Sequence, residues 1–285
     1  MKWTVEKLLR ETPAISSLPG AYTRLNEAVN DPRTSSRDVA NVITEDMALA
    51  ARILRLANSA FYGFPSKIDT VSRAVTLVGT RQLRDLALAT SIIEQFEGLS
   101  ESVVTMESFW RHSVACGVAA RILATHRREP NVERFFIAGL MHDIGRLLMF
   151  STIPELAMEA LDEAERGRKL LYRTERNLLG FDHADVGGAL LRQWKLPVHT
   201  VSAVAFHHRP AMDSGLHTDT AIVHVADLIA NAMRIGSSGE RYVPSLDNDA
   251  WKRLGLSENI LGSVLSELER QYQDAVTIIL PDSML

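Results

Sequence analysis

Cysteine is almost absent from this chain, because Cys116 is the only one among its 285 residues. A single cysteine excludes a disulfide bond within the chain and fits a reducing compartment. Long apolar runs are also missing, since no stretch reaches the roughly 20 residues that a membrane-spanning helix needs. The first residues, MKWTVEKLLRE, lack the apolar core of a secretory signal peptide. We therefore expect a cytoplasmic protein that makes no membrane contact.

The chain has no large excess of charge of either sign, and sequence patterns typical of β-strands are rare. The 31 basic and 35 acidic residues leave a net charge of −4, so we expect no basic surface for nucleic acid. Hydrophobic residues make up 46% and charged residues 23%, which is ordinary for a globular protein and excludes a disordered one. Polar and apolar residues rarely alternate, and no Asn-Gly or Asp-Gly hairpin turn occurs. These absences favour an all-α fold of about a dozen helices.

Helical periodicity and helix-start signals support this fold class. The segment 46–60 places apolar residues at spacings of four and three, which predicts a helix that is buried along one side. Ser35 followed by Asp38 predicts a capping box for a helix over 36–44. We also expect helices over 70–78, ended by Gly79, and over 80–96.

Two loops divide the chain into three parts. The weakest linkage is EGLSESVV (97–104), which separates an N-terminal helical part, 1–100, from a part that carries most of the histidines, 101–235. A second loop, IGSSGERYVPSLDND (235–249), lies at the start of the C-terminal helices, 236–285. We therefore expect an N-terminal helical subdomain, a central helical bundle and a C-terminal helix pair.

The segment AGLMHDIGRLLMF (138–150) places a histidine and an aspartate, His142 and Asp143, side by side in an apolar run. Burying an imidazole and a carboxylate is costly unless each finds a partner or a metal ion. We expect one central buried helix here. The alternative explanation is a satisfied polar pair at a helix surface, so the rest of the chain has to decide.

Seven ligand-type side chains lie on different helices or helix ends. Each has a structural alternative: His208 could stabilise a helix C-terminus, His183 could be an exposed first-turn residue, and Asp227 could pair with His224 or Arg146. Together, imidazoles and carboxylates are the usual ligands of zinc, iron, manganese or nickel. The carboxylate of a vicinal His-Asp pair can bridge two ions, so the predicted site is mononuclear or dinuclear. The candidate ligands are His112, His142, Asp143, His183, His207, His208 and Asp227.

In this chain His112, the His142-Asp143 pair and Asp227 follow one another in an order that resembles the metal ligands of HD-domain metal-dependent phosphohydrolases. The additional His183 and the pair HH at 207–208 resemble the extended site of the HD-GYP cyclic di-GMP phosphodiesterases. That family has a lysine in HDxGK and a DGxGYP loop. This chain has HDIGR, with Arg146, and HHRPAMDSGL. Arginine binds phosphate but cannot donate a proton near neutral pH. Both departures argue against hydrolysis of a cyclic dinucleotide.

The N-terminal half is similar to the HDOD domain, a regulatory relative found in bacterial signalling proteins. The similarity is carried by SLPGAYTRLNEAVNDPRTSSRDVANVITEDMALAARILRLANSAFYG and IDTVSRAVTLVGTRQLRDLALA, and later by GFDHADVGGALLRQWKLPVHTVSAVAFHHRP. It covers roughly residues 10–230. The resemblance implies an all-helical HD-like bundle with an N-terminal helical subdomain, which in most members is non-catalytic. Many members have lost part of the metal set, whereas this chain retains all seven candidate positions.

Three interpretations of function follow. The first is a bacterial signal-transduction domain that binds a signalling protein, or a nucleotide or phosphate ligand, and keeps an HD-type metal pocket. The alternative is a metal-dependent phosphohydrolase of a phosphomonoester or a cyclic nucleotide, with Asp143 and Arg146 as catalytic residues. The third is a nucleotide sensor without turnover. We expect weak or absent turnover, and partner contacts from the loop SAFYGFPSK, which offers Phe61, Tyr62 and Phe64.

Overall fold

The computed structural model describes residues 2–12, 15, 17–59, 62–96, 104–215, 218–281 and 284. All regular secondary structure within these ranges is helical, and no strand occurs in them. The prediction of an all-α fold is therefore confirmed. By their internal contacts the residues divide into two compact units, which are Met1–Ser17 with Gly98–Leu265, and Leu18–Glu97 with Ser266–Leu285.

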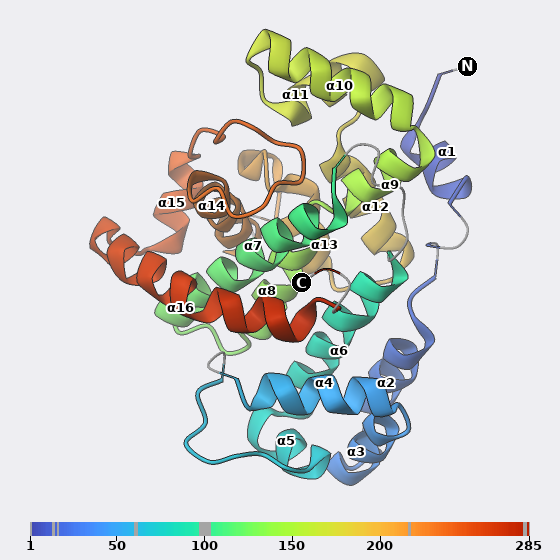
Figure 1. Cartoon of the computed structure of the whole chain (residues 1–285), viewed down its shortest axis with the longest axis vertical. Coiled ribbons are helices and arrows are strands. Elements are labelled where there is room, and N and C mark those ends of the chain that lie inside the picture. Colours follow the sequence, from blue (N-terminus) through green and yellow to red (C-terminus); the bar gives the residue numbers. More distant parts are fainter. Residues whose placement is uncertain are drawn as a thin grey trace. The chain divides into compact units, whose positions relative to one another are not determined.

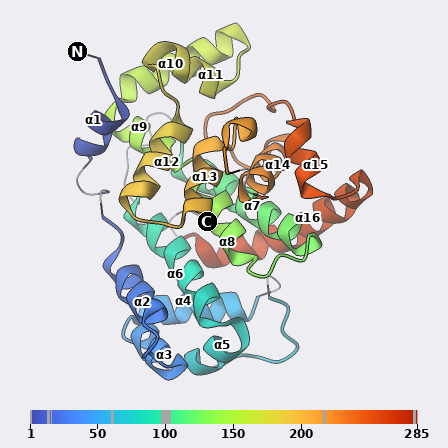
Figure 2. The ribbon, with the colours of Figure 1, turned by 180° about the vertical axis from the view of Figure 1, so that it is seen from behind.

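The unit that begins at Leu18 contains five helices of the N-terminal half, and Figures 1 and 2 show them in blue and cyan. Its α6 packs against α2, α4 and α5. The last part of α16 (Leu261–Ile279) also belongs to this unit. The five helices are α2 (Gly20–Asn30), α3 (Ser36–Thr44), α4 (Met47–Ala57), α5 (Val71–Val78) and α6 (Thr80–Gln95).

Capping residues fix the ends of these helices as the sequence predicts. The amide of Asp38 donates to Ser35 Oγ at 3.3 Å, and the amide of Ser35 donates to Asp38 Oδ2 at 2.9 Å. Both halves of the predicted capping box are thus present at the start of α3. Thr70 caps α5, and Gly79 ends it with φ of +100°, a backbone conformation that favours glycine.

The larger unit contains the remaining helices. The long helix α7 packs against α8 and α14, and α12 packs against α9 and α13. Figures 1 and 2 both show these helices side by side in the green, yellow and orange part of the chain. The helices are α1 (Val5–Arg10), α7 (Met106–His126), α8 (Glu133–Met141), α9 (Ile144–Thr152), α10 (Pro154–Gly167), α11 (Leu171–Leu179), α12 (His183–Gln193), α13 (Val198–Phe206), α14 (Thr218–Ala232) and α15 (Asn248–Leu254), with 3₁₀ turns at Pro210–Met212 and Glu258–Ile260.

The segment 138–150 is buried as expected, but the prediction of one continuous helix is wrong. Helix α8 ends at Met141 and α9 begins at Ile144, so His142 and Asp143 lie in the break between them. The chain is closely packed on both sides of the break, at Gly139 against α7 and at Gly145 against α12. A Cβ at Gly145 would lie 2.0 Å from the backbone oxygen of His183, so α9 touches the start of α12 directly. Helix α8 packs against α7, α13 and α14, whereas α9 packs against α12, α10 and α1.

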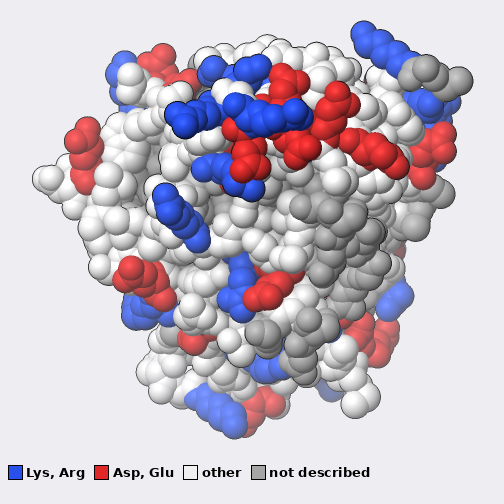
Figure 3. Space-filling view, turned by 45° about the horizontal axis from the view of Figure 1, so that its top comes forward, with Lys and Arg blue, Asp and Glu red and all other residues white. Residues whose placement is uncertain are grey.

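The charged surface is mixed. On the face shown in Figure 3, Lys and Arg lie beside Asp and Glu and do not form a separate basic area. Ion pairs of this kind include Lys169 with Glu163 at 3.1 Å and Arg241 with Glu165 at 2.6 Å. Exposed pairs such as these contribute little to the free energy of unfolding.

Among the described residues, no single helix is both long and apolar enough to cross a membrane. The segments Glu133–Thr152 and Pro154–Gly167 satisfy these criteria only as a pair, and they are bent by 119° where they meet.

Two predictions fall partly outside the described residues. The linkage 97–104 lies outside them except for Val104. In the expected partner loop, Phe61 lies outside them, while the rings of Tyr62 and Phe64 stack with their centroids 5.7 Å apart. Both rings are half-buried, and a role of this loop in partner binding stays a prediction.

Candidate metal centre

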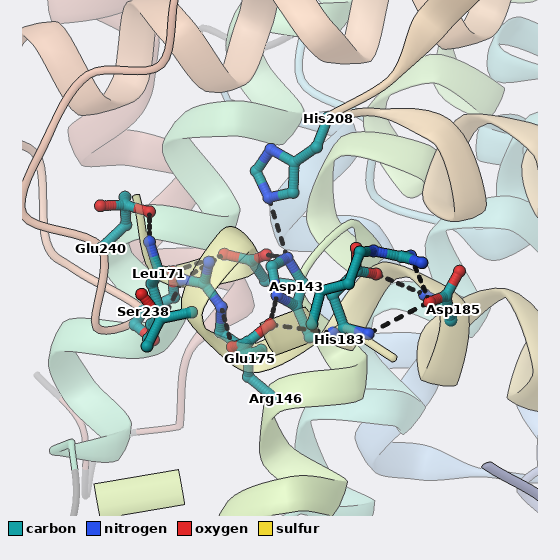
Figure 4. Close-up of polar contacts among 12 residues, drawn as sticks. Asp143, Arg146, Leu171, Glu175, His183, Asp185, His208, Ser238 and Glu240 are labelled. Atoms are coloured by element: carbon teal, nitrogen blue, oxygen red, sulfur yellow. Dashed lines mark hydrogen bonds and ion pairs between the residues drawn. The ribbon is translucent and has the colours of Figure 1, made fainter. Parts of the chain in front are cut away.

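All seven candidate ligands meet in one place within the larger unit. They come from the middle of α7, the break between α8 and α9, the first residue of α12, the two residues after α13, and the middle of α14. Six of them are at most 3% exposed, and His208 is half-buried. Figure 4 shows part of this cluster, with His183, His208 and Asp143 directed toward one another.

The first group of ligand atoms consists of His112, His142 and Asp227. Asp227 Oδ1 lies 3.3 Å from His112 Nε2 and 3.4 Å from His142 Nε2. Oδ2 of Asp143 lies next to this group, at 3.2 Å from His142 Nε2 and 3.9 Å from His112 Nε2. Two imidazole nitrogens and oxygens of two carboxylates therefore face one small volume.

The second group consists of Asp143, His183, His207 and His208. Here it is the other carboxylate oxygen of Asp143, Oδ1, that lies 2.9 Å from His183 Nε2 and 3.7 Å from His207 Nε2. The Nε2 atom of His183 is 3.0 Å from that of His208 and 3.4 Å from that of His207. The carboxylate of Asp143 thus lies between the two groups and presents one oxygen to each.

Several of these atoms are buried without a hydrogen-bond partner. His112 Nε2, His142 Nε2 and Asp143 Oδ1 have none among the described residues, although oppositely charged groups lie close to them. A buried polar atom that forms no hydrogen bond costs about 1–3 kcal/mol. A metal ion would supply the missing partner to all three atoms, so the residues present fit a divalent cation.

Contacts at the far side of each ring fix which nitrogen faces the cluster. Nδ1 of His142 lies 2.7 Å from the carbonyl oxygen of Gly139, and Nδ1 of His207 lies 2.8 Å from that of Val204. A carbonyl oxygen only accepts, so both Nδ1 atoms carry the proton and leave Nε2 free to coordinate. His183 is held in the same way by the Glu175 carboxylate, at 2.6 Å from its Nδ1. The sequence analysis did not identify Glu175, because a glutamate in LYRTERNLLG carries no local signal for this contact.

The charges of the cluster favour ionised carboxylates. Burial raises the pKa of Asp143, but the nearby Arg146 guanidinium and His142 outweigh it and hold this pKa well below its usual range. Burial likewise opposes ionisation of Asp227, yet its contacts with His112 and His142 lower its pKa well below the usual value. Burial, together with its histidine neighbours, lowers the pKa of His207 to about 3, so this ring is neutral. Two carboxylates and a neutral imidazole are suited to a cation.

Arg146, the residue expected to bind phosphate in an active enzyme, lies behind the ligands. Its side chain is 1% exposed, and Nη1 donates to the carbonyl oxygen of Ser238 at 3.2 Å and to the Ser238 hydroxyl. The same nitrogen is 3.3 Å from Asp143 Oδ2. Ser238 Oγ in turn donates to Asp143 Oδ2. Arg146 and Ser238 therefore orient the carboxylate of Asp143 (Figure 4). The segment IGSSGE gives no indication in the sequence that Ser238 takes part.

The contacts of Asp227 and the burial of His183 do not match the structural alternatives for these two residues. Asp227 contacts His112 and His142, and its carboxylate also accepts from Asn231 Nδ2 at 2.6 Å. His224 instead lies with Nδ1 2.7 Å from the carbonyl oxygen of His207, so its role is to hold the end of α13 near α14. His183 follows the N-cap Asp182, as the sequence predicts, but it is fully buried.

An aromatic ring packs against one edge of the cluster, and two arginines nearby form ion pairs. Tyr172 of α11 stacks on His208, with ring centroids 4.3 Å apart and planes 14° apart. Nearby, Arg209 Nη2 lies 3.1 Å from Asp185 Oδ1, and Arg176 contacts the same carboxylate group. These arginines are engaged by carboxylates on the protein itself.

The chain matches a known domain family. The family model of the HDOD domain matches residues 15–210. An uncharacterized protein of Treponema pallidum is 26% identical over 196 residues, which cover 68% of this chain and 37% of that protein. The chain therefore corresponds to less than half of that relative's length.

Solved structures share the fold. An HDOD domain protein of unknown function from Geobacter sulfurreducens has a TM-score of 0.79 at 22% identity, covering 98% of this chain and all of that one. A Shewanella amazonensis protein with a proposed phosphohydrolase activity has a TM-score of 0.75 at 24% identity, covering 96% of this chain and 98% of that one.

Proposed function

Because this chain belongs to the HDOD family, we propose that it is a signal-transduction domain that works by binding and holds divalent transition metal in its histidine–carboxylate cluster. The buried cluster supports the metal, since three of its atoms have no hydrogen-bond partner among the described residues. Family membership supports the signalling role. The partner would be a signalling protein or a nucleotide or phosphate ligand.

We further propose that the pocket takes two ions, and one observation carries this. The carboxylate of Asp143 presents Oδ1 to His183 and Oδ2 to His142, at 2.9 and 3.2 Å from their Nε2 atoms. A carboxylate placed in this way can bridge neighbouring ions. The first ion would be held by His112, His142 and Asp227, the second by His183, His207 and His208, and both by Asp143. Nitrogen and oxygen ligands suit iron, manganese, nickel or zinc.

Elemental analysis of protein purified without added metal tests this proposal. We expect metal in the wild type, a partial loss in His142→Ala and in His183→Ala, and the largest loss in Asp143→Ala. His126→Ala is the matched control, because His126 ends α7 away from the cluster and should leave the content unchanged. Equal metal content in all of these proteins would contradict metal binding, and complete loss in either histidine variant would favour a single ion.

The shared carboxylate also supports a second candidate function, metal-dependent phosphohydrolysis, which is the activity proposed for the Shewanella amazonensis relative. A bound metal would activate water and neutralise a phosphoryl oxygen. The residues around the cluster argue against fast turnover. Arg146 is enclosed and engaged by Asp143 and Ser238, so it is not free to bind a substrate phosphate.

Assays with phosphomonoesters and cyclic di-GMP in the presence of manganese, iron or nickel separate the two functions. We expect at most trace turnover with any of them. Multiple turnover that disappears in Asp143→Ala, while the circular dichroism spectrum and melting temperature are kept, would favour the phosphohydrolase instead.

A further inference from the structure

His208 differs from the other two histidines of the second group in how its ring is held. Nδ1 of His183 lies 2.6 Å from a Glu175 carboxylate oxygen, and Nδ1 of His207 lies 2.8 Å from the carbonyl oxygen of Val204. Nδ1 of His208, in contrast, is buried without a hydrogen-bond partner among the described residues. Hydrogen bonds at the far nitrogen fix the orientation of a ligating imidazole. The ring of His208 lacks this restraint.

The ring of Tyr172 supplies the contact that holds His208 instead. The two rings stack with their centroids 4.3 Å apart and their planes 14° apart. Tyr172 is 8% exposed, and its hydroxyl accepts from Arg173 Nε at 3.1 Å, so the phenol ring is itself held in place. Stacking is a weaker and less directional restraint than a hydrogen bond to a carboxylate.

His208 is also the outermost of the candidate ligands. It follows the end of α13 by two residues and is half-buried, whereas the other six ligands are at most 3% exposed. His183 and His207 both face Asp143 Oδ1, but no ion-pair contact links His208 to a carboxylate among the described residues. Its one hydrogen bond there joins its Nε2 to that of His183, at 3.0 Å. In Figure 4, His208 lies apart from the other labelled residues and reaches toward His183.

The number of ligands in the second group gives this difference a consequence. The group offers four ligand atoms, from Asp143, His183, His207 and His208. Four protein ligands close a tetrahedral metal site, whereas three leave one position for water or another ligand. A tetrahedral ion held by all four would therefore have no position for a donor from outside the protein. The ligand that is held least firmly is the one whose displacement would open such a position.

We propose that His208 is an exchangeable ligand of the second ion and that Tyr172 is the residue that positions it. This inference rests on the two-ion pocket proposed above. While the His208 ring is stacked on Tyr172 and directed at the cluster, the second group is complete. When His208 is displaced, a small outside donor takes the vacated position, at the least buried edge of the cluster. The stacking contact thus determines how readily this position opens.

Loading the full-length protein with cobalt(II) tests the inference, because the visible absorption of this ion depends on its coordination geometry. We expect two ions per wild-type chain. Tyr172→Leu should weaken binding of one of them by about threefold to tenfold, which is what the loss of an aromatic stacking contact costs. Tyr172→Phe is the matched control, because it keeps the ring and removes only the hydroxyl, and it should bind both ions like the wild type.

Free imidazole tests whether His208 is exchangeable. His208→Ala should still bind the second ion, more weakly, and added imidazole should restore the wild-type absorption spectrum by filling the vacated position. His183→Ala is the comparison within the same group. Its ring is fully buried and anchored by Glu175, so imidazole should not restore the spectrum of this variant.

Each result has a distinct meaning. Fewer than two ions in the wild type would overturn the two-ion pocket and this inference with it. Two ions in the wild type, bound equally well by Tyr172→Leu, would overturn the positioning role of Tyr172 alone. Imidazole that fails to restore His208→Ala, or that restores His183→Ala equally well, would overturn the exchange of His208. The imidazole experiment decides this point even if Tyr172→Leu does not fold.

Discussion

Asp143 is the residue on which the candidate metal centre depends, because its two carboxylate oxygens face different groups of histidines. The direction of this carboxylate is set from behind by Arg146 and Ser238. Residues that orient a metal ligand commonly affect metal affinity by about 10–100-fold when they are replaced. We therefore expect Ser238 to affect metal affinity through Asp143, although it would not itself coordinate an ion.

The contact of Ser238 with Asp143 gives a first prediction. Ser238→Ala should lower metal affinity by about 10–100-fold with little change in helix content, as measured by competition with a fluorescent chelator and by circular dichroism. Ser237→Ala is the matched control, because its hydroxyl contacts Glu240 and Gly239 in the same loop and not Asp143. An equal loss of affinity in both variants would point to disruption of the loop and contradict a direct role of Ser238.

The protonation of His183 gives a second prediction. Burial and Arg146 lower its pKa, but Glu175 and Asp143 outweigh them and raise it to about 9. A protonated imidazole cannot coordinate, so metal uptake near pH 7 should release a proton, and apparent affinity should increase from about pH 6 toward pH 9. Calorimetry in two buffers with different ionisation enthalpies measures the release. Identical heats in both buffers would be incompatible with it.

At the scale of helices, the break between α8 and α9 places the vicinal pair in the cluster. Neighbouring side chains of a continuous helix point about 100° apart, whereas residues at a break are free of this constraint. His142 closes α8 and Asp143 precedes α9, and their side chains meet, with His142 Nε2 3.2 Å from Asp143 Oδ2. Just after this break, α9 closely approaches α12 at Gly145.

A third prediction concerns that approach. Gly145→Ala would place a Cβ 2.0 Å from the His183 oxygen and 2.7 Å from the Gly187 amide, so backbone must move. We expect a loss of about 3 kcal/mol or more in the free energy of unfolding, together with reduced metal binding. Chemical denaturation measures the first and elemental analysis the second. Gly262→Ala, where no atom lies within 4 Å, should not destabilise the fold and should leave metal binding unchanged. A Gly145→Ala variant as stable as the wild type would refute the tight contact.

At the scale of the whole molecule, we expect metal binding to stabilise the folded state. The ligands come from α7, α12 and α14 and from the ends of α8 and α13, so the bound ions would together link five helices of the larger unit. Binding to the folded chain alone stabilises it by about 2.7 kcal/mol when the free metal is at 100 times its dissociation constant.

The fourth prediction is that removal of metal by a chelator lowers the melting temperature and that resupplied metal restores it. The reason is that His112 Nε2, His142 Nε2 and Asp143 Oδ1 would then be buried without a hydrogen bond. Scanning calorimetry measures the shift. Asp143→Ala should melt at one temperature with or without chelator, and a wild type that does the same would show that metal does not stabilise the fold.

The fold class and many helix ends could be predicted from the sequence, because they depend on short-range physics. Apolar spacing within 46–60 anticipated α4, Ser35 and Asp38 anticipated the start of α3, and Gly79 anticipated the end of α5. The histidines and aspartates of the cluster were also identified in advance, since ligand-type side chains in apolar surroundings stand out in the sequence itself.

Only the tertiary structure decided how these residues meet. The break at His142 and Asp143 and the close approach of α9 to α12 beside it have no local signal in the apolar run. Ser238 lies 95 residues from Asp143 in the chain, and its part in the cluster depends on the path of a loop. The enclosure of Arg146 likewise results from that loop and from Glu175. Periodicity and capping act over a few residues, whereas contacts between distant residues depend on the packing of whole helices, and this packing determines where each functional side chain lies.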